Sequence, residues 1–321
     1  MNRSPHVVVT GGAGFIGSHL VERLLADGRR VSVIDDCSTG TWANLTAVRN
    51  HPALRCIESR VSDCRELADL VAGAEAIYHL AAVVGVDLVM SSRIKTIEDN
   101  LHETNVVVAA AAQTRVPLVL ASTSEVYGKS LKPWFSEDDD LLIGEPQLSR
   151  WSYACSKLMD EFLALAYFKE KDLPVVVVRL FNTVGPRQIG QYGMVLPRFI
   201  VAARSGRPLQ VFGDGTQTRC FCYVGDTVEA IIRLQRSRGA FGNVFNVGNP
   251  EEISIRGLAE RVIQHVDPSG CIELVPYSQA YPAGFEDMMR RKPSIEKLVT
   301  ATGFRPVTSL DEIIRLTAAS L

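Results

Sequence analysis

A glycine-rich turn near the N-terminus constrains the fold of this chain more than any other feature. The apolar run Val7–Val9 leads directly into the letters TGGAGFIG, which place Gly11, Gly14 and Gly17 between a strand and a helix. Glycine is needed there for a tight turn, for close approach of the backbone to a pyrophosphate and for packing of the helix on the strand. The helix N-terminus adds N–H groups and a positive dipole, so the turn predicts a dinucleotide site.

Short apolar runs alternate with helical patterns through the first two thirds of the chain. After the glycine-rich turn, Ile16, Leu20 and Leu24 recur at i, i+4 and i+8 and form an apolar stripe that can pack on a sheet. This alternation predicts an α/β fold, a Rossmann doubly wound parallel sheet with a smaller mixed α/β substrate-binding lobe. The expected strands are Val7–Val9, Val31–Ile34, Ala76–Leu80, Leu118–Ala121, Val175–Leu180 and Val244–Val247.

The pattern changes from Thr183, where glycines and prolines begin to interrupt the helical pieces. Loops of that kind build binding sites more often than cores. We therefore expect residues 1–182, with about 224–248, to form the dinucleotide-binding domain. Residues 183–223 and 249–321 are expected to form the substrate-binding lobe.

Composition excludes several classes of partner. The 34 Lys and Arg residues against 36 Asp and Glu give a net charge of −2, which lacks the basic footprint of a nucleic-acid binder. The chain reaches a strand pattern too early for a cleavable signal, and no apolar stretch approaches membrane-spanning length. Seven scattered cysteines without a CxxC pair predict neither a disulfide framework nor a zinc site. We expect a cytoplasmic protein that binds no metal, nucleic acid or membrane.

The choice of dinucleotide depends on Asp35, which ends the second expected strand 18 positions after Gly17. A carboxylate there accepts hydrogen bonds from the adenosine ribose hydroxyls. It would also repel a ribose phosphate, so the sequence predicts NAD rather than NADP. Asp36 could share this role, and a plain loop carboxylate is the alternative interpretation of Asp35.

Tyr153 and Lys157 in WSYACSK stand at i and i+4 of an expected helix and share one face. A phenol is a poor base at neutral pH because its usual pKa is about 10. A nearby ammonium and a positive nicotinamide ring favour the phenolate, which would let Tyr153 remove the proton of a sugar hydroxyl. Taken alone the pair is weak evidence, because such pairs usually lie on a solvated helix face.

Several motifs together resemble the extended short-chain dehydrogenases. Besides TGGAGFIG and YACSK, they are HLAA (79–82), ASTSEVYG (121–128), RLFNTVGPR (179–187) and GDGTQTR (213–219). The chain looks most like the UDP-glucuronate decarboxylases among them, with which it shares STSEVYG, RWSYACSK, GNPEE (248–252) and FEDMMRRKPSI (285–295). This resemblance runs nearly end to end. It implies an NAD-dependent enzyme that acts on a UDP-sugar or another nucleotide sugar, as a homodimer that pairs helices near 96–113 and 153–169.

The resemblance also implies roles for single residues. Thr123 would hydrogen-bond the reacting sugar, Glu125 would act near carbons 4 and 5, and Tyr153 and Lys157 would complete the catalytic set. The implied substrate-binding residues are Thr123, Asn182 and Arg219, the last two on the diphosphate, with Arg291 near a phosphate or the sugar carboxylate. The implied cofactor-binding residues are Gly11, Gly14, Phe15, Ile16, Gly17, Asp35, Val61, Tyr153 and Lys157. Each residue also has an alternative interpretation. Thr123 could simply end a strand, Glu125 could be a solvated carboxylate and Asn182 a loop amide. Arg219 and Arg291 could be surface cations.

The chain departs from the family pattern at two positions. Arg60 precedes Val61 where these enzymes usually have an Asp, which leaves the adenine contact there open. Ser124 stands where the hexose 4,6-dehydratases carry an Asp. His79 of HLAA is interpreted as a structural residue at a strand end.

The reactions open to such an enzyme begin alike, with removal of the carbon 4 hydroxyl proton by Tyr153 and oxidation of that carbon. If carbon 5 bears a carboxylate, a β-keto acid forms and can lose carbon dioxide, which gives UDP-xylose or a UDP-4-keto-pentose. Ser124 cannot protonate the hydroxyl that leaves carbon 6 in a dehydratase, and a 4-epimerase has no use for Glu125 at carbon 5. Decarboxylation is therefore favoured over 4-epimerisation of a UDP-hexose or hexuronate, with dehydration third.

The complete acid/base set argues against the remaining hypothesis, a catalytically silent NAD-binding regulatory protein.

The orientation of Glu125 depends on where the strand ends. If the strand that ends near Thr123 continues, Glu125 two residues later faces the same side of the chain as Thr123.

Overall fold

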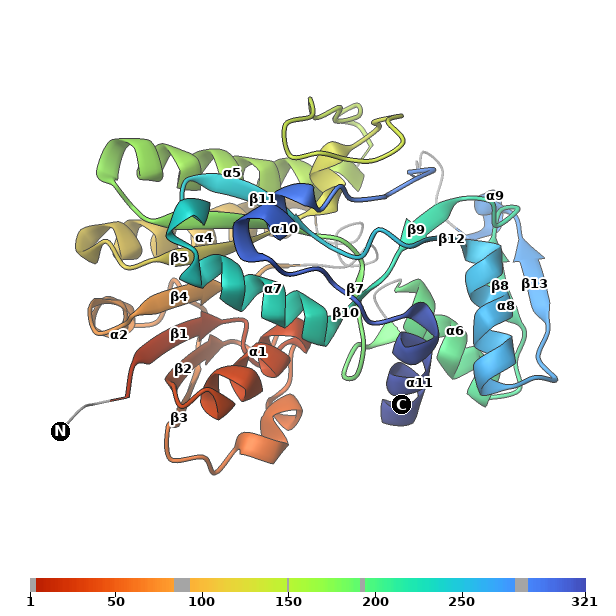
Figure 1. Ribbon diagram of the computed structural model, residues 1–321, viewed down its shortest axis with the longest axis horizontal. Helices are drawn as coiled ribbons and strands as arrows, with labels where there is room; N and C mark the ends of the chain where they lie inside the picture. The colour runs from red at the N-terminus through yellow and green to blue at the C-terminus, as the bar shows by residue number, and fades with distance from the viewer. Residues whose placement is uncertain (1–3, 84–92, 149, 191–193, 281–287) are drawn as a thin grey trace.

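The computed structural model describes residues 4–83, 93–148, 150–190, 194–280 and 288–321. Its centre is a sheet of seven parallel strands in the order β11-β6-β5-β4-β1-β2-β3 (Figure 1). The strand order reverses between β1 and β4, and ligands of such sheets bind in the crevice at that reversal. The strands are β1 His6–Thr10, β2 Arg30–Asp35, β3 Leu54–Glu58, β4 Ala76–His79, β5 Leu118–Thr123, β6 Val175–Leu180 and β11 Asn243–Val247.

Six of these strands coincide with the predicted ones, and the predicted fold class is confirmed. The prediction missed β3, which pairs with β2 at the edge of the sheet. Its residues are only half-buried and mix apolar with charged side chains. The interior strands are buried on both faces and therefore appear in the sequence as continuous apolar runs, which β3 does not.

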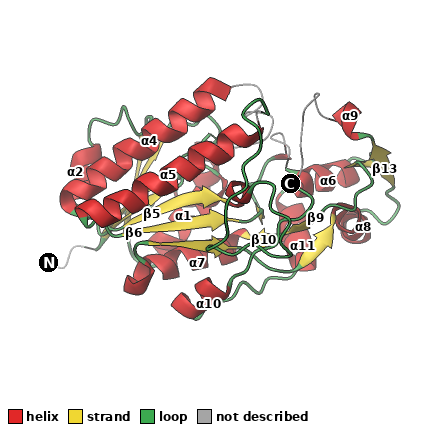
Figure 2. Ribbon diagram, turned by 90° about the horizontal axis from the view of Figure 1, so that it is seen from above, coloured by secondary structure: helices red, strands yellow, loops and turns green. Residues whose placement is uncertain are grey.

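Helices cover both faces of the sheet (Figure 2). Along β1, Val7 and Val9 enter one hydrophobic cluster and Val8 enters the other, because successive side chains of a strand point to opposite faces. The first cluster lies under α1 Phe15–Ala26, α7 Val224–Arg236 and α10 Glu296–Thr302, the second under α2 Leu67–Ala72, α4 Arg93–Thr114 and α5 Arg150–Lys171.

A smaller lobe with its own hydrophobic cluster lies beyond the carboxyl ends of the strands (Figure 1). The cluster draws on residues between 184 and 318, whereas α10, which the sequence assigns to the lobe, packs on α7 and β11 of the large domain. The predicted bounds of the two parts stay a prediction. Strands β7 Thr183–Val184 and β10 Cys222–Tyr223 pair in parallel where the chain enters the lobe. The remaining elements of the lobe are α6 Val195–Arg204, β8 Leu209–Phe212, β9 Thr218–Cys220, β12 Glu252–Ser254, α8 Ile255–Val266, β13 Ile272–Val275, α9 Tyr277–Ala280 and α11 Leu310–Ser320.

Within the described ranges, no helix combines the length and the apolar character that crossing a bilayer requires. Short 3-10 helices occupy Trp42–Val48 and Arg238–Ala240.

A buried ion pair ties α5 to the sheet. Arg179 of β6 donates to both carboxylate oxygens of Glu161 of α5, from Nε to Oε1 at 3.0 Å and from Nη2 to Oε2 at 2.8 Å. The hydroxyl of Ser122 on β5 donates to the same carboxylate at 2.5 Å. The two charged side chains are only 5% and 3% exposed, and the guanidinium lies over the ring of Tyr127. This network holds α5, which carries Tyr153 and Lys157, in a fixed position on β5 and β6.

Replacing Glu161 with Gln should lower the free energy of unfolding by about 3–5 kcal/mol, because it leaves a buried guanidinium without its counter-charge. Chemical denaturation measures this change. The matched control is Asp172→Asn, which breaks an exposed pair with Arg115 whose side chains are 77% and 66% exposed. That variant should stay within about 0.5 kcal/mol of the original protein. Equal losses in the two variants would show that the buried pair does not anchor α5.

Candidate active site

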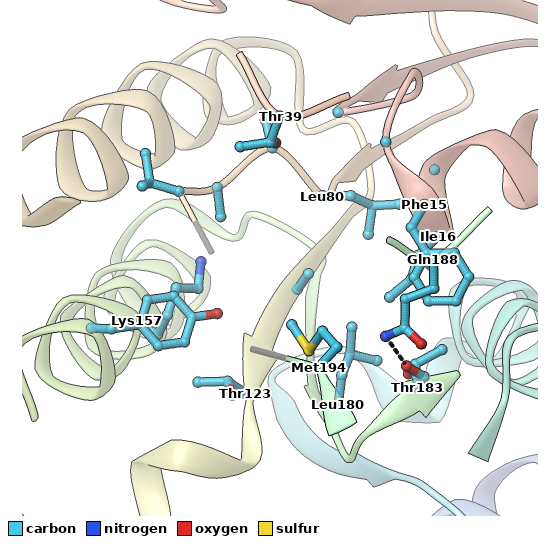
Figure 3. A pocket seen from close by; sticks show the side chains of 18 of the residues that line it. Phe15, Ile16, Thr39, Leu80, Thr123, Lys157, Leu180, Thr183, Gln188 and Met194 are labelled. Carbon is cyan, nitrogen blue, oxygen red and sulfur yellow. Dashed lines mark hydrogen bonds between the residues drawn. The ribbon is translucent and has the colours of Figure 1, made fainter. Parts of the chain in front are cut away.

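All the residues predicted to form the site line one cavity of about 630 Å³. It extends from the glycine-rich turn across the carboxyl ends of the strands to the lobe. Figure 3 shows Lys157 and Thr123 on one side of the cavity and Phe15 across from them. The predicted residues in its wall are Gly11, Gly14, Phe15, Ile16, Gly17, Asp35, Val61, Thr123, Glu125, Tyr153, Lys157, Asn182, Arg219 and Arg291. Their individual roles stay predictions.

The glycine-rich turn has the geometry that a pyrophosphate site needs. Gly11 adopts φ +72°, a left-handed conformation that favours glycine, and a Cβ at Gly17 would lie 2.0 Å from the carbonyl oxygen of Gly11. Gly14 is the N-cap of α1, and a Cβ there would meet one backbone atom, at 3.2 Å. The first N–H groups of a helix have no partner inside it. The turn therefore offers hydrogen-bond donors and an open approach to a diphosphate.

Asp35 at the end of β2 also shapes this turn. Its Oδ2 accepts a hydrogen bond from the N–H of Ala13 at 2.8 Å, and its Oδ1 accepts one from the N–H of Cys37 at 2.9 Å. Burial raises the pKa of the Asp35 carboxyl, and these two backbone donors oppose that rise. The carboxylate thus holds the turn in place and still faces the cavity. Asp36 lines the cavity as well but is exposed.

Arg60 lies in the cavity wall beside Val61 and pairs with acids of α4. Its Nη2 is 2.5 Å from Asp99 Oδ1 and 3.0 Å from Glu103 Oε1. Glu103 also accepts from the N–H of Ser62 at 2.9 Å. Asp99 and then Glu103 are the groups that raise the pKa of Arg60. Two carboxylates therefore balance the positive charge of Arg60, the residue that departs from the family pattern.

Strand β5 ends at Thr123, and the 3-10 helix η2 Ser124–Tyr127 begins at once. The expectation that Glu125 continues the strand is wrong, because the Thr123 hydroxyl accepts from the N–H of Glu125 at 3.2 Å and starts the turn. Glu125 nevertheless enters the cavity, where Arg291 donates from Nη1 to its Oε1 at 2.7 Å. Arg291 also donates from Nη2 to the Ser124 hydroxyl at 2.5 Å. The sequence did not predict the contact between Arg291 and Glu125, which are 166 positions apart.

The groups around Tyr153 shift the pKa of its phenol in opposite directions. Burial raises the pKa of its phenol above the usual range, and the negative charge of Glu125 adds to this rise. A hydrogen bond with the Thr123 hydroxyl and the positive charge of Arg291 lower the pKa. In the ligand-free protein Tyr153 is therefore a neutral phenol, and a positive charge brought in by a cofactor would move it toward phenolate.

The two residues predicted to hold a diphosphate lie on the lobe side of the cavity. The amide of Asn182 donates to the carbonyl of Cys220 at 2.9 Å, and Nη1 of Arg219 donates to the carbonyl of Thr218 at 2.8 Å. These bonds fix both side chains at the cavity edge. Sequence reasoning missed other lining residues of the loop-rich stretch, although that stretch was predicted to build a site. They are Arg187, Gln188, Ile189, Met194, Arg198, Phe212 and Gln217.

His79, interpreted as structural, is buried at the end of β4 and hydrogen-bonds two hydroxyls. Among the described residues no three His, Cys, Asp or Glu side chains lie close enough to share a metal ion.

Residues 7–248 match the family described as the NAD dependent epimerase/dehydratase family. The chain belongs to this family. It is 40% identical to the UDP-N-acetyl-alpha-D-glucosaminuronate decarboxylase of Bacillus cytotoxicus, over 97% of this chain and 95% of that protein. It is 35% identical to UDP-glucuronic acid decarboxylase 1 of Xenopus tropicalis, over 95% of this chain and 69% of that protein. Among solved structures it resembles the UDP-glucuronic acid 4-epimerase of Bacillus cereus in complex with UDP-glucuronic acid and NAD, with a TM-score of 0.88, 26% identity and 98% coverage of both chains.

The comparisons confirm that the cofactor is NAD, and the turn at Gly14 fits its diphosphate. Binding of its pyrophosphate at the N-terminus of α1 and of its adenosine ribose at Asp35 stays a prediction.

Replacing Asp35 with Asn should raise the kcat/KM ratio of NADP to NAD at least about tenfold, because the carboxylate that repels a ribose phosphate is lost. Steady-state kinetics with both cofactors measure the ratio. Asp63→Asn makes the same chemical change outside the cavity and should leave it unchanged. If the original enzyme already uses the two cofactors equally well, Asp35 does not set the preference and a cation such as Arg60 compensates for it.

Proposed function

We propose that this enzyme is an NAD-dependent decarboxylase of a UDP-hexuronate, which oxidises carbon 4 of the sugar and then releases carbon dioxide from carbon 5. The observation that carries the proposal is the contact of Arg291 with Glu125 and Ser124 beside Tyr153. Glu125 alone would repel a substrate carboxylate. Arg291 balances its charge, so that a second carboxylate can enter the cavity at an acceptable electrostatic cost. An enzyme for neutral sugars needs no such compensation.

The residues at carbon 4 perform the first step. Thr123 is hydrogen-bonded to Tyr153 and can share the sugar hydroxyl with it, so the phenol takes the hydroxyl proton as general base. When bound, NAD supplies the acceptor for the electrons of carbon 4 and later returns them. Lys157 lies one helical turn from Tyr153 on the same face of α5 and contributes positive charge near the phenol.

The residues at carbon 5 handle the second step. Oxidation at carbon 4 makes the substrate a β-keto acid, whose carbon dioxide leaves while its electrons pass into the new carbonyl as an enolate. Glu125, held by Arg291, can orient the substrate carboxylate through water or manage the proton that replaces carbon dioxide. Return of the electrons to carbon 4 gives the UDP-pentose, and early release gives the 4-keto sugar.

The substrate class follows from the relatives. The 35% identical relatives are named as UDP-glucuronic acid decarboxylases, so we take UDP-glucuronate as a candidate substrate, which decarboxylation would convert to UDP-xylose. The 40% identical relative is named for a 2-acetamido hexuronate, so both uronates are candidates. A 4-epimerase of a UDP-hexuronate is the second candidate function, because a solved structure of that activity shares the whole fold. Dehydration ranks third, since Ser124, which cannot act as an acid at neutral pH, contacts Arg291.

The proposal includes a homodimer, built on the outer faces of α4 and α5. These helices pack side by side (Figure 2) and expose Ile94, Ile97, Met159 and Phe162, with exposed fractions of 73%, 38%, 54% and 62%. A second copy that presents the same face would bury these side chains about a two-fold axis. The binding and chemistry described above lie within one chain.

Incubation with NAD and either UDP-glucuronate or its 2-acetamido counterpart should convert the sugar to a product that is lighter by one carbon dioxide. Mass analysis detects it. Tyr153→Phe should lower turnover at least about 100-fold and still bind NAD, because the phenol contributes proton transfer and little cofactor contact. An epimerised hexuronate with its carboxylate intact would show that the enzyme is a 4-epimerase. Turnover in Tyr153→Phe equal to that of the original enzyme would remove this residue from the mechanism.

Glu125→Gln should slow carbon dioxide release by about 100-fold and should slow the oxidation at carbon 4 less. Glutamine keeps the shape of the side chain and loses its charge and basicity. In a single turnover the variant should form NADH and then stall. Glu66→Gln, which changes an exposed glutamate outside the cavity, is the control. If NADH formation and carbon dioxide release fall by the same factor, Glu125 serves binding or oxidation, and decarboxylation loses its main support over epimerisation.

A further inference from the structure

The ammonium of Lys157 has a partner within its own helix. Its Nζ donates to Oδ2 of Asp160, three residues later in α5, at 2.7 Å. The side chains of both residues are almost fully buried, with exposed fractions of 3% and 0%. The second carboxylate oxygen, Oδ1, is buried and receives no hydrogen bond from the described residues. Sequence reasoning assigned nothing to Asp160.

Packing alone does not account for this carboxylate. Burying two charges costs free energy, and an apolar pair of similar volume is often as stable or more stable. The next residue, Glu161, already anchors α5 to the sheet through Arg179. Asp160 instead contacts the ammonium of Lys157 and lies close to Thr104 of α4. A buried acid in that place points to a role in the chemistry of Lys157.

The groups that face Asp160 from the neighbouring elements are neutral or already paired. Thr104 of α4 lies close to the carboxyl and, with Lys157, opposes the rise in its pKa that burial causes. His79 of β4 bonds Thr104 through Nε2 at 3.2 Å and Thr10 of β1 through Nδ1 at 2.7 Å. Burial, and then the charge of Lys157, lower the pKa of His79 to about 3, so the imidazole carries no charge at neutral pH.

The remaining charges nearby belong to other pairs. Glu161 raises the pKa of Asp160 but binds Arg179 of β6. Glu125 of η2, which raises the pKa of Tyr153, binds Arg291. Lys157 is therefore the cation that balances Asp160. The carboxylate of Asp160 in turn raises the pKa of the Tyr153 phenol, so it opposes any positive charge that Lys157 lends to that group.

We infer that Asp160 is a positioning residue that acts through Lys157: its carboxylate fixes where the buried ammonium points and how much positive charge reaches Tyr153. The inference rests on the proposed roles of Tyr153 and Lys157. The negative charge of Asp160 raises the pKa of the Tyr153 phenol, in the same direction as burial and Glu125. Removing that charge leaves the positive charge of Lys157 uncompensated, so the phenol loses its proton at lower pH.

The test is titration of Tyr153 in the complex with NAD, without any sugar. Ultraviolet difference absorbance of tyrosinate is recorded against pH, and the signal of the same background carrying Tyr153→Phe is subtracted to isolate this one phenol. Asp160→Asn should move the midpoint about one pH unit lower, the size expected for the loss of one nearby like charge. Asp160→Ser removes the same charge with a smaller side chain and should move it in the same direction.

Asp172→Asn removes a carboxylate that directly follows α5 but is exposed, and its midpoint should match the original protein. A midpoint that stays in place, moves upward or cannot be resolved in both Asp160 variants would overturn the inference. Because the titration needs no substrate, it tests the role of Asp160 independently of the proposed function. The proposed function is contradicted by a different result, the absence of carbon dioxide release by the original enzyme.

Discussion

The site depends on one constraint, the shared direction of the strands in a parallel sheet. Because all seven strands run the same way, their carboxyl ends meet at one edge, and the order reverses between β1 and β4. Asp35 ends β2 and Thr123 ends β5, so groups far apart in the sequence enter the same cavity. Both faces of the sheet are buried under helices, which leaves this edge as the place where the large domain can bind a ligand.

The cations that line the cavity include three that form close ion pairs: Arg60 with the acids of α4, Arg291 with Glu125, and Lys157 with Asp160. The last two pairs are largely buried, and pairing offsets the cost of placing charge where water is scarce. The pairs also set what a ligand meets. The glycine-rich turn offers backbone N–H groups to a diphosphate, whereas the guanidinium available to the proposed sugar carboxylate, that of Arg291, already shares its charge with Glu125.

Local features of the sequence predicted the site best. The glycine-rich turn and the Tyr153/Lys157 pair are recognisable because a strand, a turn or a single helix fixes their geometry within a few residues. The contact of Arg291 with Glu125 was out of reach, since it depends on how the C-terminal segment returns to the sheet. Asp160 was missed for another reason: charged pairs at i and i+3 of a helix usually lie in solvent, and only the packing of α4 and β4 shows that this pair is buried.

The residues proposed for the two steps come from different elements, which explains how one fold can support related reactions. Thr123, Tyr153 and Lys157, the residues proposed to act at carbon 4, come from β5 and from α5, the helix that Arg179 and Glu161 hold to the sheet. Arg291 comes from the C-terminal segment, outside the sheet and its covering helices. Oxidation at carbon 4 is common to decarboxylases, epimerases and dehydratases, whereas the fate of carbon 5 differs among them. In the proposed mechanism, the shared step therefore uses residues of the sheet and its covering helix, whereas the step that separates the reactions uses Arg291, which the C-terminal segment brings to Glu125.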